Sequence, residues 1–158
     1  MKIISAIFLS LIVAGATNAS VTESGWYGYG GSGPVALVDG VYWCYQECEG
    51  GVRILGFDDG DDCSYAYAPG AYKKQNGYLV CVSGNVTIPS TINNKAVVEI
   101  GSCAFYGCTG VTSISIPSSV LRITGGAFEG CLALTQVSGG LNVQEVNGAA
   151  FNGCSKLT

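Results

Sequence analysis

The stretch Ala104-Phe105-Tyr106-Gly107-Cys108 recurs as Ala127-Phe128-Glu129-Gly130-Cys131 and again as Ala150-Phe151-Asn152-Gly153-Cys154. Each copy begins 23 residues after the previous one. A fixed period of this length is typical of solenoid proteins, in which each repeat is one structural unit that stacks on its neighbours. The sequence therefore predicts a repeat solenoid in the second half of the chain. It also directs the search for function toward surfaces.

Other apolar positions keep the same spacing as the pentapeptide. They are Val111, Leu134 and Leu157; Ile114 and Val137; Val120 and Val143; and Ile100, Ile123 and Val146. Ile114 and Ile116 alternate with polar residues, which predicts a short, half-buried strand. Pro117 is expected to end this strand because proline has no N–H to donate. Phe128 is expected to fill the interior, and Cys131 to point inward as a small apolar side chain.

With this pattern the unit strongly resembles the 23-residue leucine-rich repeat of the BspA-like, or Treponema, type, which runs L-x-x-L-x-L-P-x-x-L-x-x-I-x-x-x-A-F-x-x-C. The resemblance covers roughly residues 86–158. It implies a parallel β-sheet of short strands, an irregular convex side with short turns, and structural roles for six repeat positions. These positions are Phe105, Cys108, Phe128, Cys131, Phe151 and Cys154.

The repeats depart from the family pattern in two places. Gly139-Gly140 stands where the preceding strand has Ile116-Pro117, so the Gly139 strand is expected to pack less well. Ile88-Pro89 lies 28 residues before Ile116-Pro117, so this repeat carries five extra residues. We expect these residues to form a loop around 92–95.

The chain before the repeats divides into three predicted segments. Residues 1–19 read as a secretory signal peptide, with a short N-terminal membrane anchor as the alternative, and no further apolar run is long enough to cross a bilayer. Residues 20–34 form a Gly/Ser-rich leader that is either poorly ordered or folded over the end of the solenoid. Residues 35–85 are predicted as a β-rich cap with irregular rungs, because Val41–Tyr45 and Val52–Phe57 look like strands and a solenoid end must be covered.

Charge excludes one class of partner. The net charge is −4, with eight acids and one base in residues 20–70 against three acids and five bases in residues 71–158. No basic patch is present that would bind a phosphate backbone, so nucleic acid is not an expected partner.

The eight cysteines fall into two groups. Those of the pentapeptides are expected to stack as buried thiols, and Cys103, which aligns with Gly126 and Ala149, is expected to be small and buried. The remaining four are disulfide candidates in an oxidising compartment, with at least one bridge expected and three pairings open. They are Cys44, Cys48, Cys63 and Cys81. A zinc site is disfavoured, because the chain has no histidine and no paired C-x-x-C spacing.

Catalysis has few candidate residues. With no histidine, Ser-His-Asp and Cys-His sites and the commonest general base are excluded. The run Asp58-Asp59-Gly60-Asp61-Asp62 is the remaining source of paired carboxylates. A solvated turn is the favoured reading, a calcium site the second and glycoside hydrolysis the weakest. We therefore predict no catalytic residues, metal or cofactor.

Recognition by a surface remains. Outward-pointing residues of the strands are expected to form polar columns made of Thr112, Ser113, Ser115, Thr135, Gln136 and Ser138, preceded by Asn85 and Thr87. This face is either simply solvated or a shallow binding surface for protein or glycan. The alternative source of aromatic anchors is the cap, with Trp26, Trp43, Tyr65 and Tyr67, for which a core position is an equal alternative. Asn85-Val86-Thr87 is a glycosylation sequon that we place in an exposed turn, and a glycan there would shield the first rung.

Two functions from different classes follow. The leading hypothesis is a non-enzymatic, secreted or cell-surface binding module, which the resemblance implies to be adhesin-like. The alternative is a structural piece that begins a longer repeat array. Only four residues follow Cys154 and no capping unit covers the last rung, so we expect further repeats or a partner at that end.

Overall fold

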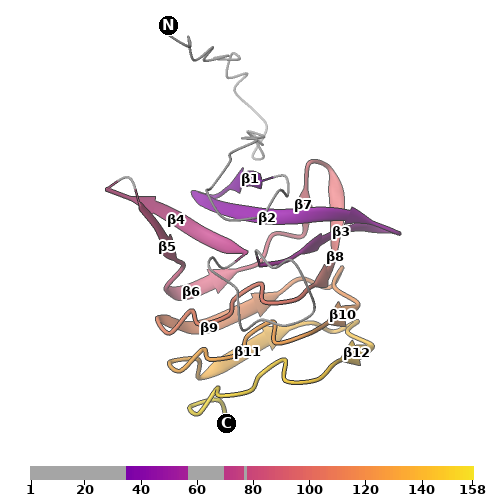
Figure 1. Ribbon diagram of the computed structural model, residues 1–158. Helices are drawn as coiled ribbons and strands as arrows, with labels where there is room; N and C mark the ends of the chain where they lie inside the picture. Colours follow the sequence, from indigo (N-terminus) through magenta and orange to yellow (C-terminus); the bar gives the residue numbers. More distant parts are fainter. Residues whose placement is uncertain (1–34, 57–69, 77) are drawn as a thin grey trace, which may run out of the picture.

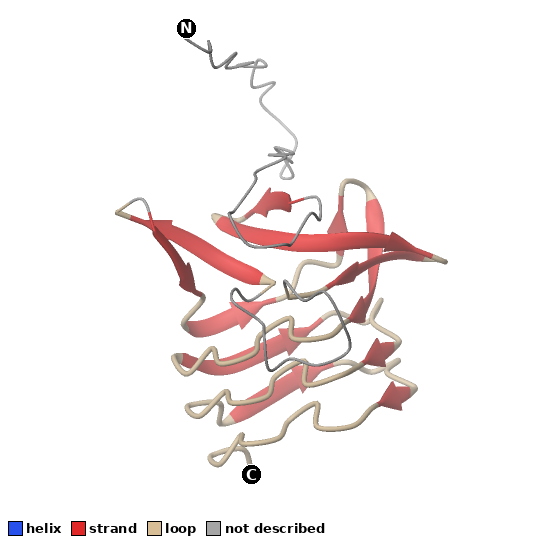
Figure 2. Cartoon of the chain, in the orientation of Figure 1, coloured by secondary structure: helices blue, strands red, loops and turns tan. Residues whose placement is uncertain are grey.

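Strands and turns make up the described chain, in which no helix occurs (Figure 2). The structure, a computed structural model, describes residues 35–56, 70–76 and 78–158. In chain order the strands are β1 (Val35–Val38), β2 (Val41–Cys48), β3 (Gly51–Ile54), β4 (Ala71–Gln75), β5 (Tyr78–Cys81), β6 (Gly84–Thr87), β7 (Thr91–Ile92), β8 (Lys95–Ile100), β9 (Val111–Ile116), β10 (Arg122–Ile123), β11 (Gln136–Gly139) and β12 (Glu145–Val146).

Two runs of parallel strands form the walls of a solenoid whose rungs stack toward the C-terminus (Figure 1). One wall is the sheet β6-β9-β11, and the other contains β3, β8, β10 and β12. Ile114 pairs with Val137, and Ile123 pairs with Val146. Residues 23 apart in the sequence are therefore neighbours across these strands, and the predicted solenoid with a parallel sheet of short strands is confirmed.

The N-terminal end of the described chain is built from antiparallel pairs. β2 pairs with β1, β3 and β4, and β4 pairs with β5. The strands predicted near Val41–Tyr45 and Val52–Phe57 are present as β2 and β3, although Phe57 lies outside the described residues. β3 also runs parallel to β8, with Ile54 opposite Ile100. The stretch 35–85 thus includes a rung of the solenoid wall as well as the antiparallel strands above it.

The extra residues of the first repeat form a hairpin. Thr91 pairs with Ala96 and Ile92 with Lys95, which leaves Asn93 and Asn94 as a two-residue turn. Both have positive φ, 50° and 61°, as the tightest hairpin turns require. Asparagine tolerates this conformation better than most residues. The insertion is therefore where the sequence predicts it, but it is an ordered β-hairpin where we expected a loop.

A column of phenylalanines occupies the centre of the solenoid. Phe105 stacks on Phe128 with ring centroids 5.1 Å apart, and Phe128 stacks on Phe151 at 5.0 Å. Trp43 continues the column upward and meets Phe105 edge-on at 6.2 Å. Phe105, Phe128 and Trp43 are fully buried, and Phe151 is half-buried. The interior role predicted for the repeat phenylalanines is confirmed. Trp43 is a core residue, so its side chain is not accessible to a ligand.

The turn at Gly139-Gly140 depends on glycine. Gly139 has φ of 80°, and a Cβ there would lie 2.1 Å from the carbonyl oxygen of Ile116. An L-residue would clash with that oxygen as well as strain the backbone. β11 keeps its parallel register with β9 through Gly139 itself, although Val137 is half-buried whereas Ile114 is fully buried.

Candidate functional site

The polar residues predicted to form a binding surface lie together on the outer face of β6-β9-β11. Backbone register places Asn85, Ser113 and Gln136 in one column. It places Thr87, Ser115 and Ser138 in a second column two residues further along the strands. Thr112 and Thr135 adjoin the start of these columns, because the backbone N–H of Thr135 donates to the Thr112 carbonyl at 2.9 Å.

Most hydroxyl groups of this face already donate hydrogen bonds within the chain. Asn85 Oδ1 accepts from Thr112 Oγ1 at 3.2 Å and from Ser113 Oγ at 2.8 Å. Thr135 Oγ1 donates to the Thr112 carbonyl at 3.0 Å, and Ser138 Oγ donates to the Ile114 carbonyl at 3.3 Å. Within the described residues, no such bond occupies the side chains of Thr87, Ser115 and Gln136. These three side chains remain free to donate to a ligand.

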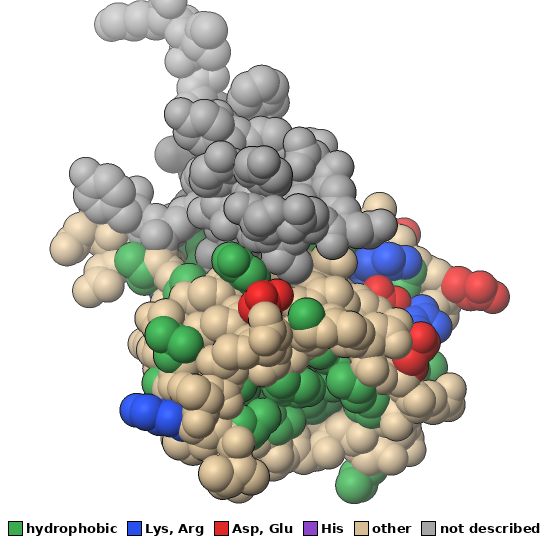
Figure 3. Space-filling view, turned by 60° about the horizontal axis from the view of Figure 1, so that its bottom comes forward, with side chains coloured by type: hydrophobic (Ala, Val, Ile, Leu, Met, Phe, Trp, Pro, Cys, Tyr) green, Lys and Arg blue, Asp and Glu red, His purple; other side chains and the backbone are tan. Residues whose placement is uncertain are grey.

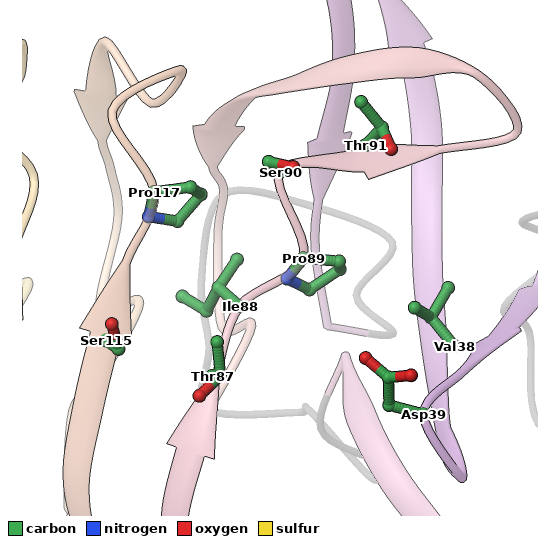
Figure 4. Close-up of a pocket in the computed structure, with 9 residues that line it drawn as sticks. All are labelled: Val38, Asp39, Thr87, Ile88, Pro89, Ser90, Thr91, Ser115 and Pro117. Carbon is green, nitrogen blue, oxygen red and sulfur yellow. The ribbon is translucent and has the colours of Figure 1, made fainter. Parts of the chain in front are cut away.

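Ser115 opens into a shallow pocket at the end of the second column. The pocket has a volume of about 330 Å³ and is lined by Val38, Asp39, Thr87, Ile88, Pro89, Ser90, Thr91, Ser115 and Pro117. Figure 4 shows Asp39, in the turn between β1 and β2, with its carboxylate directed toward the end of β6. The turn between the antiparallel strands β1 and β2 therefore borders the polar face of the first two rungs.

The lining combines an apolar floor with a few polar groups. Ile88 and Val38 are buried beneath it, and Thr87, Ser90 and Ser115 supply hydroxyl groups at its rim. Asp39 adds a single exposed carboxylate. Small binding sites commonly have this composition, in which apolar area gives affinity and a few polar groups set orientation. The pocket suits a neutral, hydroxyl-bearing group or a cationic one.

Sequence reasoning missed Asp39. A signal for it exists, because Asp39-Gly40 separates two apolar stretches, and Asp-Gly is a strong hairpin signal. Both residues have positive φ, 51° and 76°, as the predicted turn type requires. The turn is local information, but its place in the same pocket lining as Thr87 and Ser115 is a tertiary arrangement that no spacing in the sequence reveals.

The opposite wall carries a ladder of alternating charge. Arg53, Glu99, Arg122 and Glu145 stand in one register across β3, β8, β10 and β12. Glu99 contacts Arg53 at 3.5 Å and Arg122 at 3.0 Å, and only 6% of its side chain is exposed. The hydrogen bond from Arg122 to Glu99, with the charge of that carboxylate, raises the pKa of Arg122 above its ordinary value. The 23-residue spacing of Glu99, Arg122 and Glu145 is the signal in the sequence that predicts this ladder.

The pentapeptide cysteines form the predicted column. Cys108 and Cys131 are fully buried and Cys154 is half-buried. The Sγ of Cys131 donates to the Phe105 carbonyl at 3.2 Å, and the Sγ of Cys154 donates to the Phe128 carbonyl at 3.1 Å. Burial raises the pKa of the Cys131 thiol to about 12. These thiols are packing residues held in the neutral form.

The remaining cysteines differ from the prediction. Cys44, Cys48 and Cys81 are free thiols, so the bridge expected among the four candidates does not join these three, and Cys63 lies outside the described residues. Cys103 is fully buried, as expected, but it is disulfide-bonded and has φ of 55°. Cys81 belongs to the column of repeat thiols, because its side chain is hydrogen-bonded to Cys108.

Other predicted site residues are placed as follows. Asn85 is exposed, but it lies in β6 and not in a turn, and its glycosylation stays a prediction. Trp26, Tyr65, Tyr67 and the Asp58–Asp62 run lie outside the described residues. Among the residues that the structure does describe, no cluster of three or more metal-ligating side chains occurs. The same residues include no helix with the length and apolar character of a membrane span.

Comparison with known proteins agrees with this geometry. The family model for the BspA type leucine rich repeat region matches residues 78–158, in six copies. The chain is similar to the crystal structure of a leucine-rich repeat protein from Treponema pallidum, at 27% identity and a TM-score of 0.55 over 73% of this chain and 44% of that one. It is also similar to a leucine-rich repeat protein from Bacteroides ovatus, at 27% identity and a TM-score of 0.52 over 77% of this chain and 27% of that one.

The chain matches less than half the length of either solved protein. A search of curated proteins gave no match. The family match begins before Gly84, so it takes in β5 and β6 as well as the repeats that the pentapeptides mark. Since the family model covers just over half of the sequence, and the phenylalanine and cysteine columns lie where its pattern requires them, the chain belongs to the BspA-type leucine-rich repeat family.

Proposed function

We propose that this chain is a non-enzymatic, secreted or cell-surface binding module of the adhesin type, and that its ligand is a protein or a glycan. The observation that carries the proposal is the pocket at the end of the polar face, where the carboxylate of Asp39 and the hydroxyl of Ser115 line opposite sides of an apolar floor. Leucine-rich repeat modules generally mediate binding, and proteins of the BspA type are often secreted or surface-associated.

The chemistry of the face favours shallow, polar recognition. The column residues are small, and the rings of Trp43, Phe105 and Phe128 are buried in the core. Protein hot spots are usually Trp, Tyr or Arg, and the two columns contain none of these. A ligand that bears hydroxyl groups can exchange hydrogen bonds with Ser115, Gln136 and the rim of the pocket without needing such anchors. A glycan therefore fits this face better than a flat protein surface does.

The test is a binding screen against a glycan array and immobilised extracellular-matrix proteins, repeated with variants. Ser115→Arg fills the pocket, Asp39→Asn removes its charge, and Ser118→Arg places the same bulk on an exposed turn beyond the pocket lining. We expect a ligand of the unmodified chain to bind at least about tenfold more weakly to Ser115→Arg and to bind normally to Ser118→Arg. A ligand that binds all three variants equally well would place the binding site elsewhere.

A second function is supported by the apolar surface of the last rungs. Leu132, Leu141 and Val146 are 50%, 88% and 56% exposed, and green apolar side chains gather at this end in Figure 3. Phe151 and Leu157 are half-buried, with one side against the core. We propose that a further repeat or a partner stacks here. Adding one more copy of residues 135–157 directly after Leu157, in place of Thr158, continues the 23-residue period and is expected to raise the melting temperature, and an unchanged or lower value would count against stacking.

A further inference from the structure

Cys81 and Cys108 occupy equivalent places on neighbouring rungs. Cys81 ends β5 three residues before β6 begins, and Cys108 lies three residues before β9. β6 and β9 are parallel neighbours in which Gly84 pairs with Val111, and the N–H of Gly84 donates to the Gly110 carbonyl at 2.9 Å. Neighbouring strands are about 4.8 Å apart, which lies within the Cα separation of about 4.4–6.8 Å that a disulfide spans.

The thiols of this pair are hydrogen-bonded to each other, whereas the thiols of the next two rungs are hydrogen-bonded to carbonyl groups. The side chains of Cys81 and Cys108 are joined by a hydrogen bond. On the next two rungs the thiols of Cys131 and Cys154 donate instead to the carbonyls of Phe105 and Phe128. The insertion upstream of β9 makes the spacing from Cys81 to Cys108 27 residues, whereas the later cysteines of the column are 23 residues apart. The rung that contains Cys81 is therefore longer than the rungs that follow it.

The two thiols also differ in access and reactivity. Cys81 is half-buried, whereas Cys108 is fully buried. The hydrogen bond from Cys108 lowers the pKa of Cys81 to about 7, while the same hydrogen bond, and then burial, raise the pKa of Cys108. A thiolate with a pKa near ambient pH is the optimal attacking group in thiol–disulfide exchange. The pair thus has an accessible nucleophile in front of a buried second thiol.

We propose that Cys81 and Cys108 form an oxidisable dithiol site, in which a low-molecular-weight disulfide such as oxidised glutathione converts the pair into a disulfide between β5 and the first repeat. The site is separate from the polar face and does not depend on the function proposed for that face. Both thiols of the site are free, and among the described residues this is the pair of cysteine side chains that are hydrogen-bonded to each other.

The reaction proceeds in two exchange steps. The Cys81 thiolate attacks one sulfur of oxidised glutathione, the glutathione S–S bond breaks, and one glutathione leaves as a thiolate. Cys108 then attacks Cys81 Sγ in the mixed disulfide, and the second glutathione leaves as it takes up the proton that Cys108 gives up. Two protein thiols are oxidised to one disulfide, and one oxidised glutathione is reduced to two molecules of glutathione.

The new bond would join the hairpin β4–β5 to the repeats covalently. It closes a loop that contains β6, β7 and β8. Cross-links that close loops of this size stabilise proteins mainly by restricting the unfolded chain. An increase in melting temperature on the order of 10 °C is expected on oxidation.

The experiment uses the full chain, treated with oxidised glutathione, alkylated with iodoacetamide and mapped by mass spectrometry of unreduced peptides. Cys81→Ser removes the nucleophile at a half-buried position. Cys154→Ser is the matched control, because Cys154 is also a half-buried thiol of the column but donates to a carbonyl. We expect a Cys81–Cys108 linked peptide in the unmodified chain and in Cys154→Ser, with the gain in melting temperature reversed by dithiothreitol.

Each alternative result overturns the proposal. Recovery of Cys81 and Cys108 as separately alkylated peptides after oxidation would show that the pair does not react. A glutathione that stays on Cys81 would show that Cys108 does not complete the exchange. A link from Cys81 to another cysteine, or the same gain in melting temperature in Cys81→Ser, would assign the oxidation to a different pair.

Discussion

Glu99 and Arg122 hold the same position in successive repeats, and both Nε and Nη2 of the arginine donate to one carboxylate oxygen, at 3.1 and 3.0 Å. Arg53 contacts the other oxygen of the same carboxylate, Oε1, at 3.5 Å from the preceding rung. One buried carboxylate therefore joins three rungs of the wall. A buried charge is tolerated only when it is paired in this way.

Removal of Arg122 is expected to destabilise the fold. Arg122→Leu would leave Glu99 with a single, more distant partner, and we expect a clear loss in the free energy of unfolding, because the carboxylate itself stays buried. Glu145→Gln, at an exposed position of the same ladder, is expected to change it by less than about 0.5 kcal/mol. Urea unfolding followed by circular dichroism measures both. Equal stability of Arg122→Leu and the unmodified chain would show that Glu99 does not depend on this pairing.

Phe128 is the central ring of the stack, so its truncation should weaken two contacts between rungs. Phe128→Ala is expected to cost about 3–5 kcal/mol. Phe151→Ala should cost less, because Phe151 is half-buried and stacks on one described ring, Phe128. Chemical unfolding of the two variants tests this order. A larger loss for Phe151 would mean that the stack is not centred on Phe128.

Gly139 is expected to tolerate no side chain. Gly139→Ala combines a φ of 80° with a Cβ 2.1 Å from the Ile116 carbonyl oxygen, and we expect a loss of more than about 1 kcal/mol. Gly148→Ala is the control, because a Cβ at Gly148 meets nothing within 4 Å. Thermal melting of the two variants provides the comparison, and similar melting temperatures would contradict the assigned turn geometry.

Buried thiols should make the protein sensitive to alkali. Burial raises the pKa of Cys44 and that of Cys131 to about 12, so the folded chain keeps protons that the unfolded chain releases from about pH 9. The unfolded state then binds fewer protons, and stability falls as the pH rises from about 9 toward 12. Unfolding midpoints measured across this range should fall less steeply in Cys44→Ala. Identical slopes would mean that Cys44 ionises equally in both states.

The 23-residue period made part of this structure predictable. Because the period carries each residue onto its neighbour one rung away, it predicts that Phe105, Phe128 and Phe151 share a column and that Ser113 lies beside Gln136. The same reasoning applies to the polar face as a whole. Interactions that repeat every 23 residues can be predicted as if they were local, because both residues of each contact lie in adjacent repeats.

Contacts that do not follow the 23-residue spacing could not be predicted. Asp39 reaches the pocket through antiparallel strands that lie outside the repeat. Cys81 joins the thiol column at a spacing of 27, since the hairpin at Asn93 lengthens one rung, and we therefore grouped it with the wrong cysteines. The left-handed backbone shared by Cys103, Gly126 and Ala149 was hidden, because two of these three residues are not glycine.

The pocket is assembled from the turn of Asp39 and the first two rungs, while the rungs that follow stack away from it. Duplication or loss of repeats beyond β11 would lengthen or shorten the molecule without touching a residue of the pocket lining. Ligand specificity and molecular length are therefore free to evolve separately in a chain with this construction. A homologue with a different number of repeats can inherit the same pocket, and one of equal length can carry a different pocket through a change in the Asp39 turn alone.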